Sequence, residues 1–120
     1  MNNKKPDIPG TPVQPDTNWE ELFNSKYLRW FHLKGQEFKM TIERVEMEVP
    51  MTLPGGIKEK KPVVFFTKGT RPLVLCKTNG NLIVESTGEP SPYKWPGKTI
   101  TLYQSKTRLG SKTVPCIRIK

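Results

Sequence analysis

The chain has 120 residues, of which 34% are hydrophobic and 26% charged, so it suits one globular domain and excludes two domains of ordinary size. It contains no apolar run long enough to span a membrane and no apolar stretch typical of a signal peptide, which predicts a cytoplasmic protein without membrane contact. The 20 lysine and arginine residues exceed the 11 acidic residues and give a formal net charge of +9.

The basic excess lies in the second half of the chain. Residues 58–120 carry 13 basic and 3 acidic residues, a net charge of +10, whereas residues 1–57 have a net charge of −1. Lysine and arginine neutralise phosphates and release condensed counterions, so we expect a polyanionic partner, with nucleic acid as the leading candidate. A basic surface that serves only solubility is the alternative.

Prolines recur at every third position near the N-terminus, at Pro6, Pro9, Pro12 and Pro15. This period is typical of an extended polyproline II segment, which can dock in an aromatic groove of a partner. We favour a disordered spacer without a ligand, and we divide the chain into a proline-rich tail at 1–18 and a single domain at 19–120.

A short N-terminal helix is predicted after the tail. Asp16 or Thr17 would cap it and residues 19–22 would form it, because early acidic side chains complement the positive end of a helix. Residues 27–31 are then predicted to be extended or to turn before the first long strand.

The first long strand begins near Phe38, and its alternation slips once. Glu43 and Arg44 mark the point of the slip, where one inserted residue would form a β-bulge. Such a bulge bends a strand so that its two halves serve different faces of a small barrel. The apolar residues of the two phases are Phe38, Met40 and Ile42, and then Val45, Met47 and Val49.

Turn-rich segments separate the later strands. Residues 50–61 are predicted as a long hairpin connection, and residues 108–111 as the turn between the last two strands. The predicted strands themselves are 63–66, 73–76, 99–105 and 114–119.

Residues 77–86 carry two conflicting signals. Asn79-Gly80 between apolar runs favours a hairpin. The same residues suit a helix that Thr78 or Asn79 would cap and Gly88 would end. Its inward side chains would be Leu82, Ile83 and Ser86. The residues alone leave both structures open.

Three segments resemble small OB-fold proteins of phages and prophages that act as single-stranded DNA-binding or replication and recombination accessory proteins. They are KPVVFF at 61–66, RPLVLCKTN at 71–79 and WPGKTITLY at 95–103. The resemblance covers roughly residues 26–120. It implies a mainly β fold, a five-stranded OB-fold Greek-key barrel with one helix between strands 3 and 4, to which the short N-terminal helix is an addition. It therefore favours the helix over the hairpin at 77–86.

Catalytic and metal-binding patterns are not found. Asp7 and Asp16 are the only aspartates, and His32 has no serine or cysteine at a triad-like spacing, so we predict no enzyme and no cofactor. His32 is interpreted as a partly buried structural residue. Cys76 and Cys116 form no CxxC pair, which predicts free, partly buried thiols and no zinc or redox site.

Binding a single strand requires cations that follow the phosphates and rings on which bases stack. In OB-folds the ligand crosses strands 2 and 3 between the loops that join strands 1 to 2 and 4 to 5. We place Lys58, Lys60 and Lys61 in the first loop and Lys106, Arg108 and Lys112 in the second. Further predicted phosphate contacts are Lys39, Arg44, Lys68, Arg71 and Lys77.

The stacking candidates follow from strand alternation. If Val64 and Phe66 point inward, Phe65 points outward together with Lys61, Val63 and Thr67. Tyr103 points outward if Ile100 and Leu102 point inward. For both rings, packing under a loop or against the tail is an equal alternative. Trp30 and Trp95 are interpreted as core or rim packing.

Sequence-tolerant binding of single-stranded DNA in phage replication or recombination is therefore the leading hypothesis, with RNA as a variant. A phage or host replication protein and a second copy of the chain are further candidate partners. The rival hypothesis is a protein-interaction or inhibitor module without a nucleic-acid role.

Overall fold

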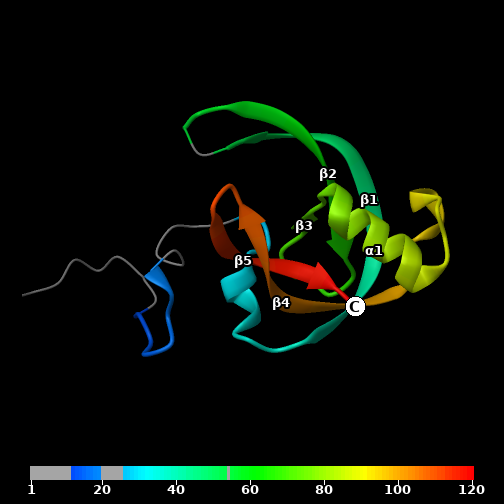
Figure 1. Cartoon of the computed structure of the whole chain (residues 1–120). Coiled ribbons are helices and arrows are strands. Elements are labelled where there is room, and N and C mark those ends of the chain that lie inside the picture. Colours follow the sequence, from blue (N-terminus) through cyan, green and yellow to red (C-terminus); the bar gives the residue numbers. More distant parts are fainter. Residues whose placement is uncertain (1–11, 20–25, 54) are drawn as a thin grey trace, which may run out of the picture.

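The structure is a computed structural model that describes residues 12–19, 26–53 and 55–120. This part of the chain is mainly β, as predicted, with a five-stranded antiparallel sheet, one α-helix and two short 3-10 turns (Figure 1). The strands are β1 (Phe38–Thr52), β2 (Lys58–Phe66), β3 (Leu73–Val74), β4 (Thr99–Leu109) and β5 (Lys112–Ile119). The turns are η2 (Trp30–Leu33) and η3 (Pro92–Lys94). No helix in the described ranges is long and apolar enough to cross a membrane.

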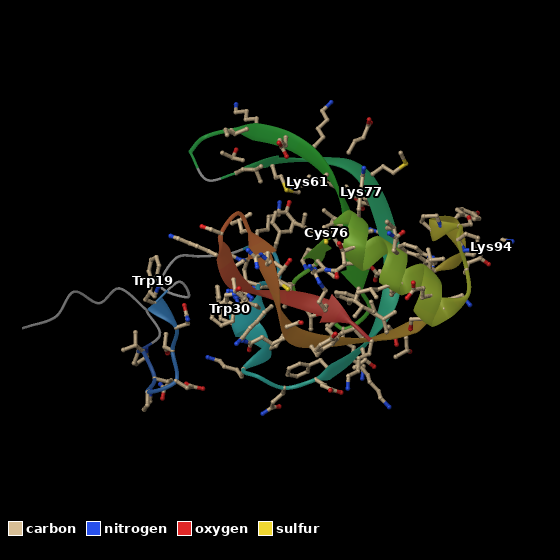
Figure 2. All side chains as sticks on the ribbon, viewed as in Figure 1. Trp19, Trp30, Lys61, Cys76, Lys77 and Lys94 are labelled. Carbon is tan, nitrogen blue, oxygen red and sulfur yellow. The ribbon has the colours of Figure 1, made fainter. Side chains whose placement is uncertain are left out.

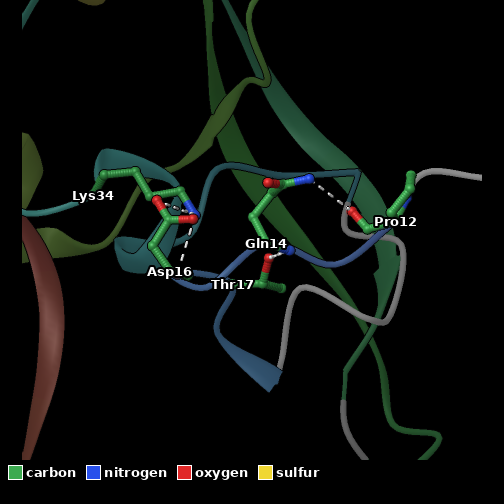
Figure 3. A network of polar contacts seen from close by, with 5 residues as sticks. All are labelled: Pro12, Gln14, Asp16, Thr17 and Lys34. Atoms are coloured by element: carbon green, nitrogen blue, oxygen red, sulfur yellow. Dashed lines mark hydrogen bonds and ion pairs between the residues drawn. The ribbon is translucent and has the colours of Figure 1, made fainter.

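Most of the short helix predicted at 19–22 lies outside the described residues, as do the first 11 residues of the proline-rich segment. The described end of that segment turns back on itself (Figure 3). Gln14 N–H donates to Thr17 Oγ1 at 2.8 Å, and Gln14 Nε2 donates to the carbonyl of Pro12 at 3.4 Å. Lys34 joins this turn to η2, because its Nζ lies 3.7 Å from Asp16 Oδ2.

The sheet order is β3-β2-β1-β4-β5, so β1 is its central strand. Its first part pairs with β4 and its later part with β2. The predicted bulge is confirmed, because Ile42 pairs with Phe66 and Arg44 with Phe65, which leaves Glu43 as the extra residue. Beyond this point β1 and β2 continue away from the body as a long curved hairpin (Figure 1).

A second irregularity in β1 was not predicted. The register shifts between Glu46 and Val49, where two β1 residues stand opposite Pro62 of β2. Proline has no N–H to donate to the ladder, so a bulge is readily accommodated opposite it. Glu48 adopts a left-handed conformation there, with φ of +52°. Met47, which shares the second apolar phase with Val45 and Val49, is 80% exposed.

The core lies between the concave side of the sheet and α1 (Lys77–Thr87). Val64, Phe66, Ile100 and Leu102 are buried in it, as their predicted inward orientation requires. Trp95 is 2% exposed and packs in the same core, which confirms its predicted packing role.

The disputed segment is a helix, so the hairpin alternative at Asn79-Gly80 is wrong. Gly88, with φ of +71°, ends α1 as predicted, because glycine adopts this left-handed conformation without strain. The N-cap is Cys76, and neither Thr78 nor Asn79 takes that position.

Tertiary contacts explain why residues 77–87 form a helix despite the local turn signal. Ile83 is fully buried as predicted, whereas Ser86 is exposed and Asn79 is the polar residue that α1 buries. Asn79 Nδ2 donates to the carbonyl of Ile117 at 3.0 Å, and its Oδ1 accepts a hydrogen bond from Arg118 Nη1 at 3.3 Å. A buried amide satisfied in this way fixes the start of α1 against β5.

The predicted barrel is not confirmed, because the sheet is open between its edge strands β3 and β5. We call this gap the seam. Pro72 precedes β3 and Pro115 lies within β5, and neither proline has an N–H for pairing across the gap. Other segments use the edge carbonyls instead: Leu28 N–H donates to Pro72 at 2.8 Å, and the Asn79 side chain donates to Ile117.

Candidate nucleic-acid interface

The predicted loop lysines lie in strands. Lys58, Lys60 and Lys61 belong to β2, Lys106 and Arg108 to β4, and Lys112 to β5. The predicted loop positions are wrong because both hairpins are longer than the apolar pattern indicates. In the β1–β2 hairpin, Leu53 N–H donates to the carbonyl of Ile57, so only a tight turn separates the strands.

These six cations nevertheless lie on two β-hairpins. The β1–β2 and β4–β5 hairpins both extend from the body on the same side in Figure 1. We call their six predicted cations the hairpin group. Lys94, by contrast, lies on the far side of the molecule from both hairpins (Figure 2). Six predicted cations therefore lie on two hairpins of one sheet. The β1–β2 hairpin also carries Glu46, Glu48 and Glu59, and Lys61 Nζ lies 3.7 Å from Glu59 Oε2.

Phe65 does not offer an open ring face to a base. The ring is half-buried, and the Arg44 guanidinium lies 3.9 Å from its centroid. Arg44 Nε in turn donates to Glu46 at 2.7 Å, and Arg44 Nη1 contacts Glu43. The hydrogen bond with Glu46 is the main cause that raises the pKa of Arg44. Arg44 is thus engaged by two carboxylates and one ring.

Val63 was predicted to share the outward face with Phe65, but it is fully buried. It pairs with Val74 of β3, and the two side chains lie on the same side of the sheet. The side of β2 that carries Phe65 is therefore partly closed by apolar contacts.

Tyr103 points outward as predicted, because Ile100 and Leu102 are buried on the other side of β4. The ring is half-buried, and Lys120 Nζ lies 5.7 Å from its centroid. Lys120 also binds Glu37 at 2.5 Å, and this hydrogen bond is the main cause that raises the pKa of Lys120. Phe65 and Tyr103 belong to strands that β1 separates, so they do not form one stacking platform.

The other predicted phosphate contacts lie elsewhere. Lys39, Lys68 and Arg71 are near the end of β2 opposite its hairpin tip, and we call them the turn group. Lys39 and Lys68 line one small pocket of about 100 Å³. Arg71 lines a neighbouring pocket with His32. Lys77 begins α1 beside β3 (Figure 2). The 13 predicted residues are thus divided among several places on the surface.

His32 is half-buried and its Nδ1 accepts a hydrogen bond from Arg29 N–H at 2.8 Å, which confirms the predicted structural role. Among the described residues, no three His, Cys, Asp or Glu side chains form a group that could hold a metal ion. Cys76 and Cys116 are free, as predicted. Cys116 is half-buried, but the expected partial burial of Cys76 is wrong, because Cys76 is exposed.

A pocket in the seam was not predicted. It has a volume of about 490 Å³, and both edge strands, the start of α1 and the segment before η2 contribute to it. Its lining includes Trp30, Val74, Asn79, Pro115 and Arg118. Because three stretches that are far apart in sequence, 28–30, 73–79 and 109–118, build this pocket, no local pattern in the sequence could reveal it. Trp30 is half-buried there against the core, as its predicted packing role requires.

Comparison with family models, with curated proteins and with solved structures finds no match to this chain.

Proposed function

We propose that this protein binds single-stranded DNA with little sequence preference, along the cations of its β1–β2 and β4–β5 hairpins. The observation that carries the proposal is the common direction of the β1–β2 and β4–β5 hairpins, which together hold the hairpin group of six cations (Figure 1). Two such projections would hold a flexible phosphate chain between them, because each neutralised phosphate releases a condensed counterion.

The fold supports the same proposal in its connections. A central β1 shared by β2 and β4, with a helix between β3 and β4, is compatible with an OB-fold whose barrel is open at the seam. We further propose a cytoplasmic accessory role in phage DNA replication or recombination, without catalysis. RNA is a second substrate to compare in the same assay.

A titration of labelled thymidine oligonucleotides tests the proposal. We expect binding at low salt that weakens about 50-fold between about 50 and 200 mM NaCl if four phosphates are neutralised, since the slope for single strands is about −0.7 per phosphate. Absence of binding at low salt, or an affinity that does not change with salt, would reject the proposal.

A protein-binding role is the second candidate, and exposed apolar side chains near the hairpin turns favour it. Ile57 is 58% exposed and Leu109 is 71% exposed. Deletion of residues 1–17 tests whether the proline-rich segment recruits a protein. A partner lost on this deletion, but retained when Lys60, Lys61, Lys106 and Arg108 are all reversed in charge, would favour the second candidate.

A further inference from the structure

The seam pocket combines apolar walls with the guanidinium group of Arg118. Trp30, Val74 and Pro115 supply the apolar surface, and no acidic side chain lines the pocket. Its volume of about 490 Å³ lies within the range of small-ligand sites. Leu109, the last residue of β4 and next to Arg108, also lines it, so the pocket extends to the tip of the β4–β5 hairpin.

Arg118 is the residue that points to an anion. Its side chain is held by neutral groups: Nη1 donates to Asn79 Oδ1 at 3.3 Å, to the carbonyl of Ile117 at 3.3 Å and to Cys76 Sγ at 3.9 Å. Arg118 is half-buried, and within the described part of the chain it forms no ion pair with a carboxylate. A fixed guanidinium without a counter-charge is a ready partner for a phosphate oxygen.

The edges of the seam argue against an added peptide strand as the occupant. Pro115 removes a donor from β5, and the Ile117 carbonyl already accepts hydrogen bonds from Asn79 and Arg118. On the other side, Leu28 occupies the carbonyl of Pro72 beside β3. A strand-forming peptide would find few backbone partners, whereas a flat ring needs only apolar walls.

We propose that the seam pocket binds one nucleotide, with its base against the apolar wall that includes Trp30 and its phosphate on Arg118. This rests on the proposed function, since the nucleotide would belong to the single strand held by the hairpins. The pocket thereby supplies the ring contact that Phe65, covered by Arg44, does not.

Alkylation of Cys76 provides a test in the unaltered protein, because this exposed thiol lines the pocket. We expect saturating thymidine 5′-monophosphate to slow its reaction with iodoacetamide, as measured by mass spectrometry. Thymidine and inorganic phosphate should protect it much less at equal concentration. Equal protection by thymidine and its monophosphate, or none by either, would overturn the proposal. So would stronger protection by an acidic aromatic dipeptide.

Arg118→Gln tests the phosphate contact directly. We expect it to weaken binding of thymidine 5′-monophosphate about 10-fold or more, with partial recovery in Arg118→Lys, since hydrogen bonds to charged groups contribute that much. Lys94→Gln, outside the pocket and on the far side of the molecule from the hairpins, is the control with the same loss of charge. NMR spectra of each variant would report both folding and the position of the nucleotide, and unchanged affinity in folded Arg118→Gln would contradict the inference.

The two proposals fail in different ways. If oligonucleotides bind through the hairpin lysines but the mononucleotide does not protect Cys76, only the pocket assignment is wrong. If the mononucleotide protects Cys76 but oligonucleotides do not bind, the pocket assignment holds and single-strand binding is rejected.

Discussion

The surroundings of Arg44 remove it from the cations available to a polyanion. The sequence places Arg44 beside a bulge and gives no sign of an ion pair. In the structure, Glu43 and Glu46 pair with its guanidinium, and the ring of Phe65 packs against it. Lys60, in contrast, is exposed on the β1–β2 hairpin and forms no ion pair within the described ranges. Two cations that look equivalent in sequence therefore have different expected roles.

The salt dependence of oligonucleotide binding should separate these two residues. Lys60→Ala removes a phosphate contact, so we expect the slope of log affinity against log salt to become shallower by about 0.7. Arg44→Ala should leave the slope within error of the original value. An equal change in both variants would show that Arg44 also contacts phosphate.

A second residue-scale prediction concerns the buried amide of Asn79. Asn79→Ala leaves the Ile117 carbonyl and Arg118 without this partner, and we expect a loss of about 1 to 3 kcal/mol in the free energy of unfolding. Asn81→Ala, at an exposed position of the same helix, should change it by less than about 0.5 kcal/mol. Urea unfolding measures both, and similar values would contradict the role assigned to Asn79.

Among the elements, α1 shows where local sequence signals are insufficient. Asn79-Gly80 is a strong hairpin signal, yet the buried amide and Ile83 hold these residues in a helix against β5. The bulge at Glu43 was predictable because the apolar phase changes on both sides of it. The second bulge was not predictable from apolar alternation, since Met47 lies in an exposed hairpin where burial imposes no alternation. The only local sign of this bulge was Pro62, which lies opposite it in β2.

Two glycines of α1 provide an element-scale test. Gly80 lies in the first turn, and an added Cβ would meet Leu75 Cδ2 at an ordinary contact distance of 3.7 Å. Gly80→Ala should therefore stabilise the protein by about 0.5 to 1 kcal/mol. Gly88→Ala should destabilise it by about 1 kcal/mol, because φ is +71° at the C-cap. Thermal and urea unfolding would reveal the opposite signs, and the same sign would contradict this description of α1.

At the scale of the molecule, the sequence predicted the number and order of the main elements correctly, but it did not predict that the sheet stays open. The antiparallel strands and the helix after β3 follow from patterning and from the family resemblance. The open seam depends on Pro72, Pro115 and the Leu28 segment. These residues are far apart in the sequence, so no local hydrophobic pattern could link them. The hairpin lysines were identified, but their strands extend farther than apolar alternation could indicate.

The distribution of charge over the molecule provides a matched control for the hairpin lysines. The hairpin group projects with the two hairpins, whereas Lys39 and Lys68 of the turn group lie near the other end of β2. Removing two positive charges from either group changes the net charge equally. Only removal from the hairpins should affect a strand held between them.

The affinity of a thymidine oligonucleotide of about 20 nucleotides, longer than the roughly 4 to 16 nucleotides that a single-strand-binding domain covers, is the most direct measurement. At low salt, Lys60→Ala combined with Lys106→Ala should weaken binding about 10-fold, while Lys39→Ala combined with Lys68→Ala should change it less than about 2-fold. Equal losses in the two pairs, or no loss in the hairpin pair, would contradict binding between the hairpins.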